Sequence, residues 1–300
     1  MPGSEAGHDD DGYWRALLAM ANVPALSRPG MTALSPPLLS AADPPPVEAA
    51  NPEGAAPFLF ICDHASRAVP RRLGALGLSD EELSRHIGWD IGAAEVARRL
   101  SKRFDAPAIL SGYSRLVVDC NRPTDDPTSI PAISDGVVVP GNRALATEDV
   151  AGRVDACFHP YHRAIRRALK AKERDGRAPA LLSIHSCTPE LRGFARPWHV
   201  GVLWDQDGRI ARPLMRALEA RGGVCVGDNQ PYSARTHSGY SIDAHANAVG
   251  LPHVMVEIRQ DLIADQAGVA RWEAVLGDAL APILADRSLY TRFSPAGAAP

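Results

Sequence analysis

Two histidines in this sequence each follow an apolar run, a position where side chains can form a metal site. His64 comes two residues after Phe58–Cys62, and His185 comes directly after Ala180–Ile184. Two imidazoles and one carboxylate can hold a divalent metal ion and leave a coordination position for water. An ion held in this way lowers the pKa of the water and polarises a carbonyl group. This pattern predicts a metal-dependent hydrolase, and the candidates for its carboxylate ligand are Asp63, Asp90 and Asp119.

A fourth carboxylate, Glu257, follows the apolar run Val254–Val256. A carboxylate beside a metal site can take the proton of the attacking water and pass it to the leaving nitrogen. We therefore interpret Glu257 as the general base and acid of an amide hydrolase. A serine mechanism is not expected, because no G-x-S-x-G motif surrounds Ser186, the serine next to His185.

The elements that must position these residues alternate between buried strands and amphipathic helices. Apolar runs predict strands at 58–62, 108–110, 116–118, 180–184, 199–204, 224–226 and 253–258. Helical spacing predicts helices at 91–104, 151–172, 210–221, 241–249 and 268–284. This alternation favours a three-layer α/β/α fold, in which helices cover both faces of a mostly parallel or mixed central sheet. Because ligands bind beyond the carboxyl ends of such strands, we expect the polar residues after each run to converge there.

Residues 1–56 differ in composition from the rest of the chain. They are rich in Ala, Ser and Pro, which predicts an irregular arm with a short helix at 13–20. We expect residues 57–300 to form a single catalytic domain. One interpretation of the arm is a contact between copies of the chain in a homo-oligomer.

The composition argues against several classes of function. With 300 residues, 45% of them hydrophobic, the chain can bury a sizeable core. A formal net charge of −3 does not suit a general nucleic-acid binder, and no apolar run approaches the ~20 residues of a membrane span. Five widely spaced cysteines without a C-x-x-C pair predict neither a disulfide framework nor a structural Cys-type zinc site. The N-terminus lacks the basic-then-apolar order of a signal peptide, so we expect a cytoplasmic protein.

Several linked motifs resemble the N-formylglutamate amidohydrolase family. They are CDHASRAVP (62–70), GWDIGAAE (88–95), YSRLVVDCNRP (113–123), SIHSCTP (183–189) and VEIRQDL (256–262), and NQPYS (229–233) fits as well. The resemblance spans residues 57–285. It implies a phosphorylase/hydrolase-like fold similar to that of zinc carboxypeptidases. It also implies a hydrolase with one Zn²⁺ or other divalent ion per chain, which cleaves N-formyl-L-glutamate to formate and L-glutamate at the end of a histidine degradation route.

The resemblance assigns the metal ligands residue by residue. Zinc carboxypeptidases carry a His-x-x-Glu pair, but here Arg67 stands three residues after His64 and cannot bind zinc. Zinc-dependent cell-wall amidases of a similar fold instead use a carboxylate at the start of the next helix, where this chain has Asp90. The implied ligands are therefore His64, Asp90 and His185, and Glu257 resembles the catalytic Glu. Asp63 remains the alternative ligand, or a partner that orients His64.

The resemblance also implies how the substrate is held. Carboxypeptidases bind a substrate carboxylate with an Asn-Arg pair, which Asn121 and Arg122 match. A planar guanidinium suits a small anionic N-acyl amino acid, because it binds a carboxylate with two parallel hydrogen bonds. Arg259 and Ser186 are further substrate-binding candidates, and we expect Arg115 to stabilise the carbonyl oxygen during attack.

Two alternative functions stay open at this point. A hydrolase of the same fold could act on another N-acyl amino acid, a small peptide or a cell-wall fragment. A non-catalytic binding protein could keep the pocket without turnover.

Overall fold

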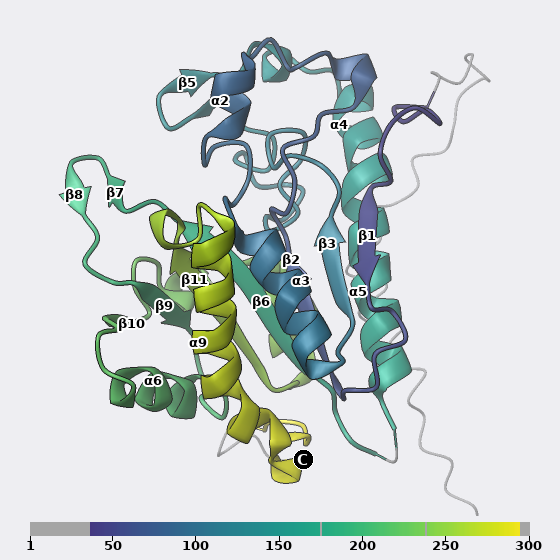
Figure 1. Ribbon diagram of the computed structural model, residues 1–300. Coiled ribbons are helices and arrows are strands. Elements are labelled where there is room, and N and C mark those ends of the chain that lie inside the picture. The colour runs from purple at the N-terminus through teal and green to yellow at the C-terminus, as the bar shows by residue number, and fades with distance from the viewer. Residues whose placement is uncertain (1–36, 175, 238, 295–300) are drawn as a thin grey trace, which may run out of the picture. The chain divides into compact units, whose positions relative to one another are not determined.

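A seven-stranded sheet forms the centre of the protein in a computed structural model that describes residues 37–174, 176–237 and 239–294 (Figure 1). Its strand order is β1-β3-β2-β6-β11-β9-β10. The bounds of these strands are β1 Val47–Ala50, β2 Phe58–Cys62, β3 Ala108–Ser111, β6 Ala180–Cys187, β9 Val200–Leu203, β10 Val226–Asp228 and β11 His253–Arg259.

The sheet is mixed, and its central strands are parallel. Strands β3, β2, β6 and β11 run in one direction, β1 pairs antiparallel with β3, and β9 pairs antiparallel with β11. Every residue of β2 and β6 is buried, as expected for strands covered on both faces. The carboxyl ends of β2, β6 and β11 therefore meet at one edge of the sheet, where the candidate site residues lie.

Helices cover both faces of the sheet and complete the three layers. One face packs against α3 (Ala93–Phe104), α6 (Ala211–Ala220) and α9 (Gln266–Ala285). The other face packs against α5 (His159–Lys172) and α8 (Tyr240–His245). Alternate residues of β2 serve the two faces, because Phe58 and Phe60 join the first cluster while Leu59 and Ile61 join the second. The predicted α/β fold of three layers is confirmed.

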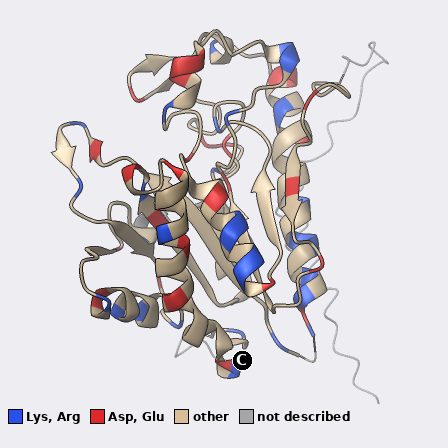
Figure 2. Ribbon diagram, viewed as in Figure 1, with Lys and Arg blue, Asp and Glu red and all other residues tan. Residues whose placement is uncertain are grey.

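The remaining elements belong to the connections. A capping box at Ser79 starts α2, where Ser79 and Glu82 bond to each other's backbone. Helix α5 carries several Arg and Lys, and acidic and basic residues are interspersed elsewhere (Figure 2). These elements are α2 Asp80–Ser84, α4 Thr147–Arg153, α7 Ala234–His237, and the short hairpins β4–β5 (Ile133–Ser134, Val137–Val138) and β7–β8 (Glu190–Leu191, Phe194–Ala195).

The helix predicted at 151–172 is continuous but irregular. It begins earlier, at Thr147, and a π-helical turn at Val154–Phe158 separates α4 from α5. Pro160 stands two residues after the end of this turn and has no N–H to donate to the preceding turn.

The prediction of a strand at 116–118 is wrong, because this run is a buried turn. Side chains take the place of a neighbouring strand there. Asn142 donates to the carbonyl of Leu116 at 2.8 Å, and the buried Arg153 donates to the carbonyl of Val117 at 3.3 Å. The apolar run correctly predicted that these residues are buried. It could not distinguish a strand from a turn whose backbone carbonyls are hydrogen-bonded by side chains.

Part of the segment expected to be an irregular arm is an edge strand. Strand β1 pairs with β3 from Val47↔Ser111 to Ala50↔Ala108. Residues 1–36, including the helix expected at 13–20, lie outside the described residues. The role of the arm in assembly stays a prediction. Within the described ranges, none of the helices is both long enough and apolar enough to span a membrane.

Candidate active site

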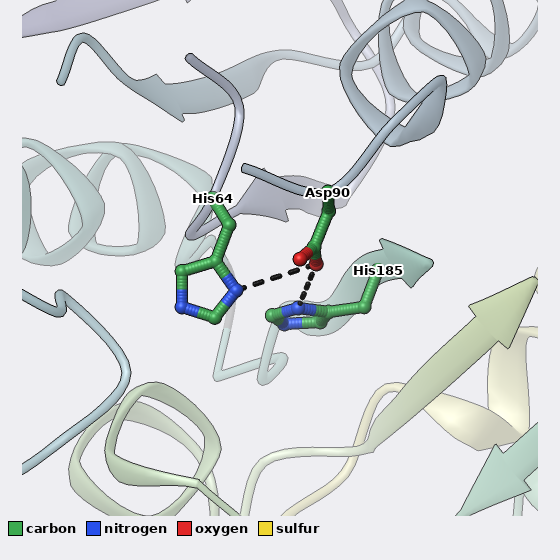
Figure 3. Close-up of side chains that lie close together, drawn as sticks. All are labelled: His64, Asp90 and His185. Atoms are coloured by element: carbon green, nitrogen blue, oxygen red, sulfur yellow. Dashed lines mark hydrogen bonds and ion pairs between the residues drawn. The ribbon is translucent and has the colours of Figure 1, made fainter. Parts of the chain in front are cut away.

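His64, Asp90 and His185 come together at the carboxyl ends of β2 and β6 (Figure 3). The imidazole ring centres lie 5.1 Å apart. Nδ1 of His64 lies 3.3 Å from Oδ2 of Asp90, and Nδ1 of His185 lies 2.8 Å from the same oxygen. One nitrogen or oxygen atom from each residue lies within 4.8 Å of those of the other two. All three side chains are buried.

The backbone around Asp90 explains why this residue reaches the site. Its N–H donates to the carbonyl of His64 at 2.9 Å, which ties the start of α3 to the end of β2. Gly92 then adopts a left-handed conformation (φ 79°), and a Cβ there would lie 2.2 Å from the carbonyl oxygen of Ile263. Only glycine fits this turn, which accounts for the second glycine of the GWDIG sequence.

The outer nitrogens of the two rings are held by different carboxylates. Nε2 of His64 lies 2.8 Å from Asp119, and Nε2 of His185 lies 2.9 Å from Asp63. With each carboxylate accepting the Nε2–H, the Nδ1 atom of each ring would be free to offer its lone pair to a bound metal ion. Asp63 was expected either to bind the metal or to orient His64. The structure instead places Asp63 behind His185, and Asp119 orients His64.

The donor set fits a divalent metal ion. Two imidazole nitrogens and a carboxylate oxygen are ligands that zinc binds well, and other divalent ions accept them too. Burial alone would raise the pKa of Asp90, but the adjacent histidines hold it well below its usual range. Burial alone would lower the pKa of His185, but its hydrogen bonds to Asp63 and Asp90 raise it well above the usual value. A bound cation would take the place of the proton at Nδ1 of each imidazole.

Glu257 lies beside this cluster, directly opposite His185 in the β11–β6 pairing. Its side chain is buried, and Oε2 has no hydrogen-bond partner among the described residues. Burial raises the pKa of Glu257 to about 7, and the charge of Asp90 adds to the shift. A carboxyl group that titrates near neutrality is suited to take up and release a proton.

A cavity of about 930 Å³ opens in front of these residues. Most of the predicted site residues line it: His64, Asp90, Arg115, Asn121, Arg122, His185, Ser186 and Glu257. Arg259 is not among the lining residues. Its guanidinium pairs with Asp261 and donates to the carbonyl of Arg196.

The basic residues of the cavity have different partners. Arg115 donates to Asp119 through Nε (3.0 Å) and Nη2 (2.7 Å), and its Nη1 lies 3.8 Å from Asp90. Arg115 therefore braces both carboxylates. The guanidinium of Arg122 donates only to the carbonyl of Asn121 at 3.1 Å and forms no ion pair within the described ranges. The guanidinium of Arg122 is thus the better placed of the two to bind a ligand carboxylate.

Two predicted substrate-binding residues have protein partners of their own. The amide oxygen of Asn121 accepts a hydrogen bond from the backbone of Ser241. Ser186 donates from its hydroxyl to the carbonyl of Ile91 and from its backbone N–H to Asp90, so it supports the candidate metal ligand. Arg67, at the position of the carboxypeptidase Glu, donates to Ser84 of α2.

Sequence reasoning missed two groups of residues. Asp63 also accepts hydrogen bonds from Tyr161 (2.9 Å), Ser183 (3.3 Å) and Ser241. No sequence signal links these donors, because they come from α5, β6 and α8. The cavity wall also includes Tyr232 and Tyr240, and the NQPYS motif was the available signal for Tyr232.

Comparisons with known proteins agree with this architecture. The family model of N-formylglutamate amidohydrolase matches residues 56–264. The crystal structure of a gene product from Agrobacterium tumefaciens is 34% identical, covers 82% of this chain and 99% of its own, and superposes with a TM-score of 0.75. The crystal structure of N-formylglutamate amidohydrolase from Ralstonia eutropha JMP134 is 20% identical and similar in fold, with a TM-score of 0.59 over 80% of this chain and 97% of its own. No curated protein matches the sequence.

Proposed function

The chain belongs to the N-formylglutamate amidohydrolase family, and from this premise we propose that it uses a divalent metal ion to hydrolyse the amide bond of a small N-acyl amino acid. The observation that carries the proposal is the convergence of the Nδ1 atoms of His64 and His185 on Asp90, next to the buried Glu257. We propose N-formyl-L-glutamate as the first substrate to test and zinc as the resident ion.

Five side chains support the metal in this proposal. His64, Asp90 and His185 would hold the ion, which when bound would lower the pKa of a water molecule and polarise the substrate carbonyl. Asp119 and Asp63 keep the two rings in the tautomer that offers Nδ1.

Glu257 provides the proton transfer. Its buried carboxyl group, whose Oε2 has no hydrogen-bond partner among the described residues, accepts the proton of the attacking water and returns it to the departing nitrogen. Hydrolysis of a formyl amide then yields formate and a free amino group. In this scheme Arg115 holds Asp119 through two of its nitrogens.

Arg122 holds the substrate carboxylate. Its guanidinium offers two parallel donors to a carboxylate and lines the cavity without forming an ion pair within the described ranges. Holding the carboxylate at a fixed distance from the metal ligands places the amide near Glu257, and such positioning contributes to the rate.

The size of the cavity favours a second candidate substrate. N-formylglutamate has about a dozen non-hydrogen atoms, whereas pockets of about 300–1,000 Å³ hold drug-sized ligands. A volume of about 930 Å³ therefore leaves room for a longer acyl group or a larger amino-acid side chain. We include N-acyl amino acids of both kinds among the candidates.

The test measures metal content and hydrolysis on the same full-length protein. Elemental analysis should find one divalent ion per chain. N-formyl-L-glutamate, N-acetyl-L-glutamate, N-formyl-L-phenylalanine, a dipeptide and a cell-wall fragment are then assayed for release of the amine. Activity should disappear with a chelator and return with zinc. Binding of an N-acyl amino acid without turnover would favour a binding protein, and absence of both metal uptake and hydrolysis would contradict the proposal.

A further inference from the structure

Tyr232 lies in a loop whose shape depends on Asn229. Asn229 has a left-handed backbone (φ 53°), and its side-chain oxygen accepts hydrogen bonds from the backbone of Trp204 at 3.2 Å and of Ala234 at 3.0 Å. The first bond ties Asn229 to the residue after β9, and the second ties the two ends of the loop to each other. The NQPYS motif has no role in the proposed function. Its first residue, Asn229, therefore serves to hold the loop that carries Tyr232.

The same loop lies directly against β9 at the residue opposite Glu257. A Cβ at Gly201 would lie 1.9 Å from the carbonyl oxygen of Gln230, so a side chain there would push the loop away. Gly201 is the partner of Glu257 in the β9–β11 pairing. Tyr232 follows Gln230 by two residues and lines the same cavity as Glu257. Tyr232 and Glu257 thus line one cavity and come from segments that meet at Gly201.

A buried arginine, Arg196, is hydrogen-bonded to the Tyr232 hydroxyl. Nη2 of Arg196 donates to the hydroxyl oxygen at 3.2 Å, and the guanidinium carbon lies 5.0 Å from the ring centre. Arg196 is fixed in turn, because its Nη1 donates to the carbonyl and the hydroxyl of Thr188. A hydroxyl has one proton to donate. Since Arg196 fills an acceptor position, the proton of Tyr232 remains available for a ligand in the cavity.

The hydroxyl keeps this proton at neutral pH. Burial raises the pKa of Tyr232, and the nearby charge of Glu257 raises it further.

We propose that the Tyr232 hydroxyl donates a hydrogen bond to the carbonyl oxygen of the scissile amide, and that Arg196 is a positioning residue that holds this donor. The proposal rests on the proposed function, because it requires an amide in the cavity. Negative charge develops on that oxygen during attack. A donor directed at developing charge lowers the barrier more than it tightens substrate binding.

The experiment compares wild type, Tyr232→Phe, Arg196→Lys and the double variant, each loaded with zinc, on the best substrate of the panel. Tyr232→Phe keeps the ring and removes the hydroxyl. We expect kcat and kcat/KM to fall together by about 10- to 100-fold, with KM within about threefold of wild type. Arg196→Lys should lower kcat in the wild-type background and have little further effect in the Tyr232→Phe background. Tyr290→Phe is the matched control, because its hydroxyl bonds to the carbonyl of Leu284 and lines no part of the cavity.

Three results would overturn the proposal. They are a kcat of Tyr232→Phe within twofold of wild type, an increase in KM at constant kcat, and additive losses in the double variant. If wild type cleaves no substrate, the proposed function has failed on its own, and binding of a tetrahedral phosphonamidate analogue of the attacked amide then decides. Tyr232→Phe should bind the analogue at least about tenfold more weakly. Equal affinities, or no binding to either protein, would overturn the role of Tyr232 as well.

Discussion

The carboxylate of Asp63 and the imidazole of His185 are joined by a hydrogen bond of 2.9 Å, formed at Nε2 while Nδ1 of the same ring meets Asp90. Asp63 is itself held by donors from three other elements. The orientation of His185 is thus fixed from outside the candidate metal site. His64 has a corresponding partner in Asp119, which Arg115 holds in place.

Asp63→Asn should weaken metal binding. The substitution removes the negative charge that favours the Nε2–H tautomer of His185, and loss of such outer partners typically costs about 10- to 100-fold in metal affinity. Competition with a chelating dye measures the dissociation constant for zinc. Asp126→Asn is the control, because Asp126 lines the cavity but its side chain bonds only to Thr128 among the described residues. Equal affinity of Asp63→Asn and wild type would contradict the role given to Asp63.

Glu257→Gln should retain metal and lose turnover. The amide side chain keeps the size of Glu257 but cannot carry the proton, and general acid–base catalysis contributes about 10²- to 10⁴-fold. Steady-state kinetics and elemental analysis of the same preparation check both parts. A variant that turns over substrate at the wild-type rate would exclude Glu257 as the base.

The same substitution should change how stability depends on pH. The pKa of Glu257 is about 7 in the folded chain against 4.5 for an ordinary glutamate, so between these values the folded state binds more protons than the unfolded state. The free energy of unfolding contributed by Glu257 therefore falls as the pH rises through 7. Glu257→Gln does not lose stability in this way. The free energy of unfolding of the variant, minus that of wild type, should therefore increase by about 1–3 kcal/mol from pH 5 to pH 8. Denaturation of chelator-treated protein at the two pH values measures the change. A difference that is the same at both would show that Glu257 titrates normally.

Arg122→Lys should impair substrate binding although the charge is kept. A lysine cannot form the two parallel hydrogen bonds of a guanidinium, so we expect kcat/KM to fall about tenfold or more, mainly through KM. Arg167→Lys on the exposed, basic side of α5 is the matched control and should leave both constants unchanged. Similar behaviour of the two variants would remove Arg122 from the binding site.

Arg153→Met should destabilise the segment that carries the site. Methionine fills much of the space of this fully buried side chain but leaves the carbonyls of Val117 and Gly141 without their donor. We expect the free energy of unfolding to fall by about 1–3 kcal/mol. Urea denaturation measures this loss, and Arg167→Met at an exposed position should cost far less. A variant as stable as wild type would mean that water replaces these bonds.

The strand ends were predictable because buried parallel strands leave a simple pattern in the sequence. The apolar runs before His64, His185 and Glu257 are β2, β6 and β11, and parallel strands bring their carboxyl ends to one edge. The placement of Asp90 rested on the resemblance, and the structure brings it to the two histidines.

The pairing of each acid with its histidine could not be predicted in the same way. It depends on ring rotation and on the path of the 114–122 segment, which side chains hold as a turn. Arg259 is another example. An acid two residues further on, Asp261, pairs with its guanidinium outside the cavity, and no pattern in the strand shows this. Which of several nearby side chains a charged group pairs with depends on the three-dimensional arrangement.

The candidate ligands come from three segments that are far apart in the chain. Asp90 stands 26 positions from His64 and 95 from His185. A single ion bound to all three would hold these segments together in the folded chain. An ion that binds only the folded chain also stabilises it in proportion to the logarithm of its excess over the dissociation constant. The same cation would therefore stabilise the tertiary structure, so that removal of the metal would lower the free energy of unfolding as well as abolish activity.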